Sequence, residues 1–131
     1  MRIHLDVLGW LHALAGAFGV ITGASLIVLA LGTFLAESAL GAHAGAVASV
    51  AWTLTVCGLL FGLGGGLMIA AGRAVLARRP GGRAAALWLA VVNLCVIPFG
   101  TALGIYTFWA LLNDDARRAF GRKPHGPLDA E

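Results

Sequence analysis

The positions of the basic residues constrain this chain more than any other feature. All nine Lys and Arg residues lie near the N-terminus, in the middle or near the C-terminus of the chain. They are Arg2; Arg73, Arg78, Arg79 and Arg83; and Arg117, Arg118, Arg122 and Lys123. Between them run three stretches free of Asp, Glu, Lys and Arg, 7–35, 44–72 and 84–112, each 29 residues long. A helix needs only about 20 apolar residues to cross a bilayer, so the sequence predicts an integral membrane protein.

The long apolar runs predict helices rather than a closed barrel. Backbone polar groups in lipid must be satisfied internally, and only helices and closed barrels achieve this. A barrel would show alternating strands of about ten residues. Charged residues make up only 11% of the chain, against about 25% in a typical soluble domain. We therefore expect an all-α integral membrane protein, a compact four-helix transmembrane bundle forming a single domain over residues 1–131.

The predicted spans follow the apolar runs. They are about 7–35, 46–72, 83–96 and 99–115, followed by a basic, flexible cytoplasmic tail over 116–131. Asp6 is expected to cap the first helix by accepting its free backbone N–H groups. The run Pro80-Gly81-Gly82 is a strong break signal, so 73–83 is expected to form a loop. The first apolar run is about twice as long as the h-region of a signal peptide, and we expect it to be retained as a span.

Pro98 divides the third apolar stretch and leaves two readings. In the first, helices 83–96 and 99–115 fold back on each other at Pro98, which places every basic residue on one side in agreement with the positive-inside bias. In the second, one long helix is kinked at Pro98, and Trp88 and Trp109 mark opposite interfaces. Fourteen helical residues rise only about 21 Å, short of a hydrocarbon core about 30 Å thick. We prefer the first reading because of the basic residues. Its short hairpin requires snorkelling arginines, local thinning of the bilayer, or a re-entrant element shielded by the first two helices.

Small residues recur at every fourth position in the apolar stretches. The glycines that we expect to mediate helix packing are Gly19, Gly23, Gly58, Gly62, Gly66, Gly100 and Gly104. Four-residue spacing places such residues on one helix face, where missing side chains let two backbones approach closely. The face serves either packing inside one bundle or contact with a second copy or another membrane subunit. The spacing is equally compatible with both.

Few polar groups lie in the apolar stretches. Charges inside a membrane mark proton relays and ion pathways, so their absence argues against a proton-coupled pump and against acid–base catalysis at depth. Asn93 is the costliest of the polar side chains to bury, and we expect it to bond free backbone near Pro98 or the hydroxyl of Thr101. The candidates for a ligand or polar contact are Asn93, Pro98, Thr101 and Tyr106.

No residue set has a catalytic, metal or cofactor signature. His4, Asp6 and His12 form an incomplete ligand set for a metal, and Cys57 and Cys95 do not form a C-x-x-C pair. The basic residues flank apolar segments, so their expected partners are anionic lipid headgroups rather than nucleic acid. The candidate headgroup contacts are Arg73, Arg78, Arg79, Arg83, Arg117 and Arg118.

The C-terminal third carries a resemblance. The run from Pro98 to Tyr106, Pro-Phe-Gly-Thr-Ala-Leu-Gly-Ile-Tyr, followed three residues later by Trp109, resembles the signature of an uncharacterised group of small four-span bacterial inner-membrane proteins. That group also tends to have an Arg-containing loop before its third span, as 78–83 has here. The resemblance implies a bacterial inner membrane and four spans, and it implies no chemistry. The positive-inside bias in the first reading places both termini in the cytoplasm.

These features predict a non-enzymatic membrane protein. The leading hypothesis is an accessory or scaffolding subunit that packs through its glycine faces, as a homo-oligomer or within a larger membrane complex. One alternative is a binder or carrier of a lipid or another apolar molecule in a groove beside the short hairpin. A second alternative is a small channel or transporter with a polar path through Asn93, Thr101 and Thr55.

Overall fold

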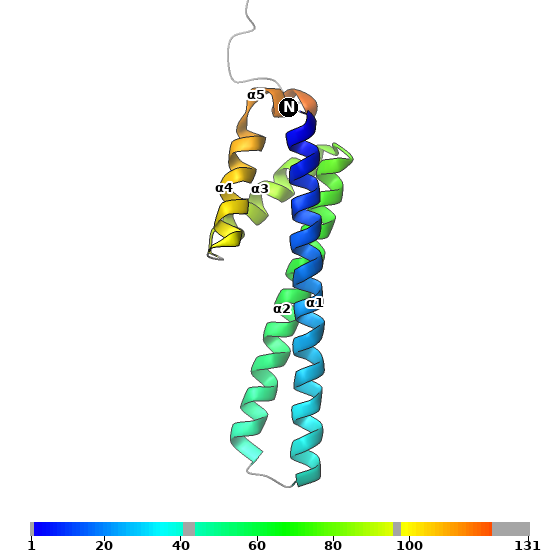
Figure 1. Ribbon diagram of the computed structural model, residues 1–131, viewed down its shortest axis with the longest axis vertical. Helices are drawn as coiled ribbons and strands as arrows, with labels where there is room; N and C mark the ends of the chain where they lie inside the picture. The colour runs from blue at the N-terminus through cyan, green and yellow to red at the C-terminus, as the bar shows by residue number, and fades with distance from the viewer. Residues whose placement is uncertain (1, 41–43, 96–97, 122–131) are drawn as a thin grey trace, which may run out of the picture. The chain divides into compact units, whose positions relative to one another are not determined.

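The protein is all-α, as predicted. The computed structural model describes residues 2–40, 44–95 and 98–121, which form five helices (Figure 1). These are α1 (Arg2–Leu40), α2 (Ala44–Leu76), α3 (Pro80–Leu94), α4 (Phe99–Leu112) and α5 (Asp114–Ala119). Two of the described helices, over Ile3–Ala39 and Gly45–Leu76, are long and apolar enough to cross a membrane.

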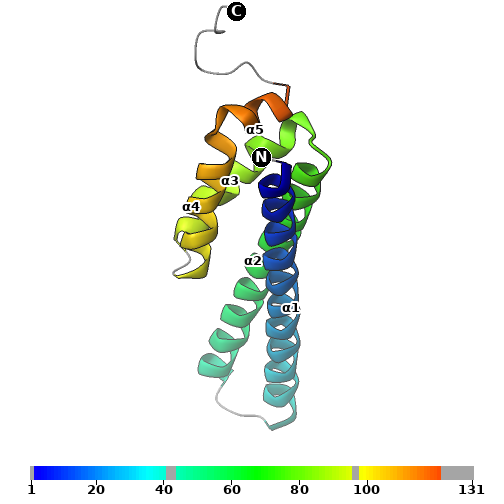
Figure 2. The same cartoon turned by 45° about the horizontal axis from the view of Figure 1, so that its top comes forward.

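The chain forms two compact units. Unit 1 consists of Met1–Leu14 and Met68–Glu131, and unit 2 of Ala15–Leu67. Unit 2 is an antiparallel pair of helical segments, one from α1 and one from α2 (Figures 1 and 2). An edge-on contact between Phe34 and Trp52, with ring centroids 6.1 Å apart, joins the two segments.

In unit 1, α3 and α4 form an antiparallel hairpin, side by side in both views of the ribbon (Figures 1 and 2). At one end of the hairpin, Thr101 Oγ1 donates to the Leu94 carbonyl at 3.0 Å. At the other end, Arg83 Nε donates to the Leu111 carbonyl at 3.0 Å. The stretch around Pro98 therefore separates two short helices instead of kinking one long helix, which is the first of the two readings. Residues 96–97 at the turn lie outside the described residues.

Buried side chains from all five helices make the core of unit 1. The cluster consists of Leu5, Leu8, Val75, Ala86, Ala110, Leu111, Ala116 and Phe120. Burial of apolar side chains stabilises each contact by about 25 cal/mol per Å² of apolar surface removed from water. Because Leu5 and Leu8 belong to α1 and Val75 to α2, the core ties the ends of these helices to the hairpin.

The connection between α2 and α3 is much shorter than the predicted loop over 73–83. Helix α2 continues to Leu76, and α3 begins at Pro80 with Arg79 as its N-cap residue. Proline suits the first position of a helix, because its missing N–H has no partner there and its φ angle is already helical. The Pro-Gly-Gly run therefore starts a helix here, where the sequence predicts a loop.

Two further boundaries differ from the predictions. Helix α1 begins at Arg2, so Asp6 lies inside the helix and its expected role as the N-cap is wrong. The predicted helix 99–115 is two helices, because the Asn113 side chain accepts from the Asp115 backbone N–H and starts α5. Phe120, which falls in the predicted flexible tail, is buried. Residues 122–131 of that tail lie outside the described residues.

Candidate functional site

Glycines bring the backbones of α1 and α2 into direct contact in unit 2. A Cβ added at Gly23 would lie 2.5 Å from the backbone nitrogen of Gly62 and 2.6 Å from the Gly58 carbonyl oxygen. A Cβ added at Gly19 would lie 3.1 Å from the Gly65 Cα. Distances this short leave no room for a side chain, so of the predicted packing residues Gly19, Gly23 and Gly58 lie at the contact between the two segments.

The buried small residues of unit 2 follow a seven-residue spacing. On α1 they are Gly16, Gly23 and Ala30, and on α2 they are Ala51, Gly58 and Gly65. A repeat of seven keeps one helix face toward its partner along a coiled coil. The four-residue spacing used in the sequence analysis therefore misses Gly16 and Gly65, and a search for small residues seven apart would have found both.

The positions where Gly62 and Gly66 would carry a side chain face away from α1, although the backbone of Gly62 lies at the contact with Gly23. A Cβ added at either position would meet no atom within 4 Å among the described residues. The two glycines are four residues apart, so they share one side of α2. One side of α2 in unit 2 therefore carries no side chain at two neighbouring positions.

In unit 1 several glycines also mark close helix contacts. A Cβ at Gly104 of α4 would lie 2.8 Å from the Ala90 carbonyl oxygen of α3, which fits the expected packing role of Gly104. Gly100, one turn earlier, is half-buried. Gly9 and Gly72, which the sequence analysis does not single out, face each other in the same way: a Cβ at Gly72 would lie 2.6 Å from the Gly9 carbonyl oxygen.

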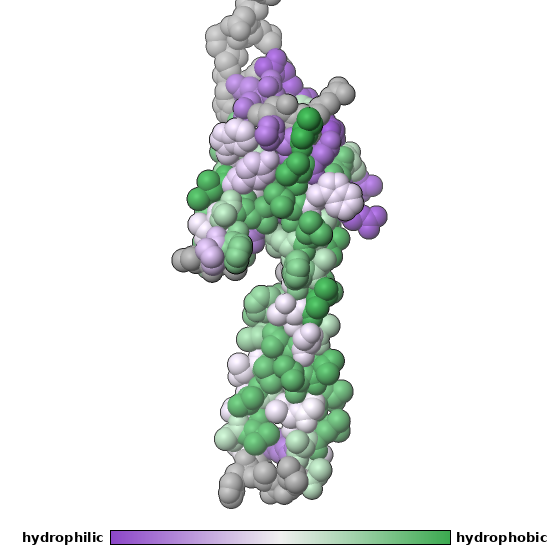
Figure 3. All heavy atoms as spheres, viewed as in Figure 1, coloured by the Kyte–Doolittle hydropathy of each residue, from purple (hydrophilic) through white to green (hydrophobic). Residues whose placement is uncertain are grey.

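The arginines expected to bind headgroups gather at one end of unit 1, where Figure 3 shows hydrophilic side chains concentrated. This end contains the α2–α3 connection, the start of α3, the end of α4 and α5. Arg78 pairs with Asp6 at 3.0 Å, and Arg118 pairs with Asp115 at 3.2 Å. Arg73 and Arg79 are exposed. Arg83, which binds the Leu111 carbonyl, and Arg117 are half-buried.

Arg78 has an unusual backbone. Its φ of 52° is in the left-handed region, and its N–H bonds the Val75 carbonyl while the Arg79 N–H bonds the Ala74 carbonyl. This is the Schellman ending of a helix, in which glycine usually occupies the left-handed position. The arginine places its guanidinium 3.0 Å from Asp6 of α1, so the connection is tied to the start of α1.

We expect Arg78→Ala and Arg78→Gly to differ in their free energy of unfolding. Arg78→Ala loses the partly exposed ion pair, worth about 0.2–1 kcal/mol, and keeps the backbone strain. Arg78→Gly loses the same pair but removes a strain of about 1 kcal/mol, so its free energy of unfolding should match that of the wild type within about 0.5 kcal/mol. Chemical unfolding of both variants measures this difference. Equal loss in the two variants would contradict the strained geometry.

Tyr106 belongs to an aromatic cluster with His4 and Trp109. The His4 Nδ1 atom lies 3.2 Å from the Tyr106 hydroxyl. The His4 ring meets the Trp109 ring edge-on at 5.5 Å, and the Tyr106 and Trp109 rings stack at 6.0 Å. The cluster joins the start of α1 to the second half of α4, a structural role that sequence reasoning did not predict.

Asn93 and Thr101 are near the same turn but do not bond as expected. The Thr101 hydroxyl donates to the Leu94 carbonyl, and Asn93 Nδ2 is buried without a hydrogen-bond partner among the described residues. Asn93 Nδ2 therefore does not make the expected bond to the Thr101 hydroxyl. Residues 96–97 of the turn, the other expected partner, lie outside the described residues. Pro98, directly before α4, is exposed.

His12 is the other side chain of unit 1 with a buried polar atom that lacks a hydrogen-bond partner among the described residues. Its Nδ1 lies 3.1 Å from the Leu8 carbonyl oxygen, which only accepts, so Nδ1 carries a proton. Nε2 has no partner in the described part of the chain. A buried polar atom left unpaired costs about 1–3 kcal/mol. Within the described residues, no group of three or more His, Cys, Asp and Glu side chains is placed to hold a metal ion.

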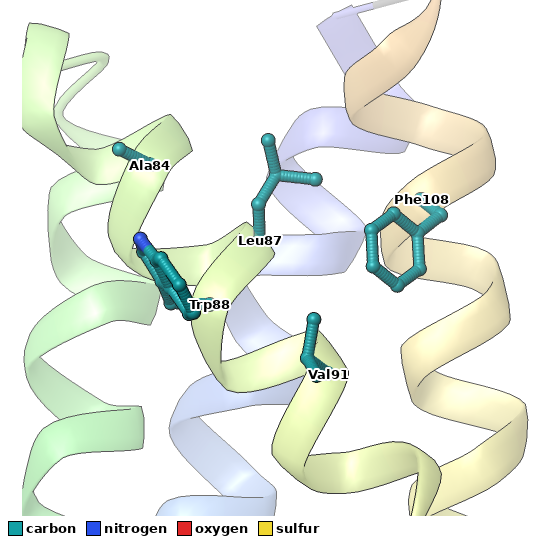
Figure 4. A pocket seen from close by; sticks show the side chains of 5 residues that line it. All are labelled: Ala84, Leu87, Trp88, Val91 and Phe108. Carbon is teal, nitrogen blue, oxygen red and sulfur yellow. The ribbon is translucent and has the colours of Figure 1, made fainter.

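An apolar groove lies on the α3–α4 hairpin. It has a volume of about 290 Å³ and is lined by Ala84, Leu87, Trp88 and Val91 of α3 and by Phe108 of α4 (Figure 4). The α3 residues recur at intervals of three and four, so they share one helix face. No known protein family, curated protein or solved structure matches the chain, and the site is therefore judged on its geometry alone.

Proposed function

We propose that this chain is a non-catalytic, multi-pass membrane protein that acts as an assembly subunit. In this proposal it associates with a second membrane helix, from another copy or from a larger complex, through the side of α2 that carries Gly62 and Gly66. The observation that carries the proposal is the open space at these two glycines. Gly19, Gly23, Gly58 and Gly65 are already used in contact between α1 and α2.

The exposure of the two long helices supports a membrane location. Only 17% of the most apolar window of α1 and of α2 is buried within the protein. Core helices of soluble proteins bury such stretches, whereas lipid accepts them exposed. Glu37 is the single Asp, Glu, Lys or Arg residue in the sequence of 15–67. A surface so poor in charge would aggregate in water.

The charge distribution supports one orientation. The six arginines between Arg73 and Arg118 lie around the ends of α2, α3, α4 and α5 in unit 1. Positive charge favours the cytoplasmic side, so we assign these ends, together with residues 2–6 of α1, to the cytoplasm. Helices α1 and α2 then cross the membrane. The bacterial inner membrane follows from the sequence resemblance alone.

The α3–α4 hairpin replaces the third and fourth spans in this proposal. Helix α3 has 15 residues and α4 has 14, and each rises only about 21–22 Å. We assign the hairpin as a re-entrant element that enters and leaves on the cytoplasmic side. Non-helical backbone at membrane depth must have its polar groups satisfied. At the turn, the Cys95 N–H bonds the Val92 carbonyl and the Thr101 hydroxyl bonds the Leu94 carbonyl.

The open glycines support association with another helix. Helices in lipid gain little from the hydrophobic effect on meeting, and they associate where small residues let the backbones approach closely. Gly62 and Gly66 provide such a surface on the lipid-exposed side of α2. A polar transport path is less well supported, because the hydroxyl groups of Thr55 and Thr101 donate to backbone carbonyls of their own helices or turn.

Energy transfer between donor-labelled and acceptor-labelled copies in lipid vesicles tests the assembly proposal. The label is attached to Cys95, which is exposed, in a Cys57→Ser background. We expect the wild-type protein to associate, and Gly66→Leu to weaken association about ten-fold because the bulky side chain keeps the helices apart.

Gly32→Leu is the matched control. Gly32 is also exposed in unit 2, also has open space around a Cβ, and lies on α1. It receives the same added volume, and we expect its association to equal that of the wild type. Equal losses in the two variants would contradict the proposed face, and absence of energy transfer in the wild-type protein would exclude association between copies. Association with a different membrane protein is measured by co-purification with the same pair of variants.

A further inference from the structure

The groove on the α3–α4 hairpin has a shape suited to a hydrocarbon chain. Figure 4 shows Leu87, Val91 and Phe108 pointing into the space between the two helices. The groove follows α3 from Ala84 to Val91, a rise of about 10 Å. Trp88, whose side chain is 75% exposed, forms one wall. The groove is lined by apolar side chains along its whole length.

One end of the groove is strongly basic. Ala84 follows Arg83 directly, and Arg79 is the N-cap residue of α3. The described charged residues at this end of unit 1 are six arginines, Arg73, Arg78, Arg79, Arg83, Arg117 and Arg118, and three aspartates, Asp6, Asp114 and Asp115. Two of the aspartates pair with Arg78 and Arg118. The end therefore carries a net positive charge beside an apolar groove, which is complementary to a lipid with an anionic headgroup.

We propose that this groove binds the acyl chain of an anionic phospholipid, whose phosphate lies at the Arg79 end of α3. The acyl chain runs along Leu87, Trp88 and Val91 toward the turn of the hairpin. A zwitterionic phospholipid has the same chains but no net charge for the arginines to attract. This inference rests on the proposed membrane location, and it is independent of assembly through Gly62 and Gly66.

Quenching of Trp88 fluorescence by brominated lipids tests the inference directly. Bromine on an acyl chain quenches only tryptophans that the chain touches. The single-Trp88 protein carries Trp10→Phe, Trp52→Phe and Trp109→Phe. It is reconstituted in phosphatidylcholine vesicles that contain brominated phosphatidylglycerol or, at equal mole fraction, brominated phosphatidylcholine. We expect an effective affinity about five-fold higher for phosphatidylglycerol, the preference that one arginine at a membrane surface gives.

A protein that retains Trp52 alone is the reference. Trp52 is also largely exposed, and it belongs to unit 2, where 15–67 contains no basic residue. We expect the two brominated lipids to quench Trp52 equally. If neither lipid quenches either tryptophan, the proposed membrane location fails. If both lipids quench Trp88 equally, the lipid-site inference fails while the membrane location stands.

Two pairs of variants separate the groove from general surface charge. Ala84→Leu fills the groove and should remove the preference at Trp88, whereas Ala85→Leu adds the same volume beside it and should retain the preference. Both alanines are exposed, and Ala85 does not line the groove. Arg79→Gln should remove the preference, and Arg73→Gln, at the exposed end of α2, should retain most of it. Uniform losses across the four variants would overturn the inference. So would loss of quenching as the protein-to-lipid ratio rises, because a second copy would then fill the groove.

Discussion

Replacing Gly65 by alanine will destabilise the protein, and replacing its neighbour Gly64 by alanine will stabilise it. A Cβ at Gly65 would lie 2.5 Å from the Gly16 carbonyl oxygen and 2.6 Å from the backbone nitrogen of Val20. Backbone atoms cannot rotate away, so the helices of unit 2 must separate, at a cost of about 1–3 kcal/mol. At Gly64 the Cβ meets open space, and alanine gains about 0.5–1 kcal/mol as the better helix former.

Both variants are unfolded in detergent micelles by adding a denaturing detergent, and the loss of helix is recorded. The change in the free energy of unfolding should have opposite signs in the two variants. Micelles that hold one copy of the protein remove any contribution from association. Gly23→Ala provides an independent repeat from the α1 side, since its Cβ would lie 2.5 Å from the Gly62 nitrogen. If Gly65→Ala and Gly64→Ala change stability in the same direction, the close contact between α1 and α2 at the small residues spaced seven apart is contradicted.

Placing one arginine at the centre of either long helix will prevent stable insertion into the membrane. Ile21 of α1 and Leu60 of α2 are 63% and 66% exposed, and both belong to unit 2, where 15–67 contains no Lys or Arg. In lipid, Ile21→Arg or Leu60→Arg costs about 2.5–3.5 kcal/mol. In water, a charged residue at an exposed position changes stability by only about 0.5 kcal/mol. If the helices lie in lipid, the inserted fraction should therefore fall about a hundred-fold. If they lie in water, the folded fraction should hardly change.

The fraction of protein that stays in membranes after alkaline extraction measures this effect. Ile3→Arg is the matched control, because Ile3 is also exposed but stands beside Arg2 at the expected headgroup level. We expect Ile3→Arg to remain inserted and the two central variants to be lost from the membrane or degraded. Soluble, folded protein from Ile21→Arg would contradict a membrane location for α1.

The sequence was sufficient to predict the all-α class and the break at Pro98, because both depend on local signals. Long charge-free runs predict long helices, and proline disfavours the helical conformation in the residue before it. The helix ends were harder to predict. Arg73 and Pro80 were assigned to a loop, yet an arginine is compatible with the last turn of a helix and proline with the first. The connection is short because Arg78 adopts a left-handed backbone, which the sequence does not reveal.

The candidate site was less predictable than the fold. Spacing of four residues identifies Gly58, Gly62 and Gly66 as equivalent, but a helix pair in close contact along its length follows a repeat of seven. The structure therefore separates Gly58, which touches α1, from Gly66, which is open. Pairings between distant parts of the chain, such as Asp6 with Arg78 or His4 with Tyr106, depend on tertiary contacts. No local pattern predicts which partner each of these side chains meets.

Labelling with a membrane-impermeant maleimide is the most direct test of the proposed membrane protein. Single cysteines are introduced by Ser38→Cys near the end of α1 and by Ala77→Cys in the α2–α3 connection, in a background with Cys57→Ser and Cys95→Ser. Both target positions are exposed. In intact bacterial cells, Ser38→Cys should be labelled and Ala77→Cys should be labelled only after the membrane is opened. Equal labelling of the two variants in intact cells, or equal protection of both, would contradict a chain whose two long helices cross the membrane.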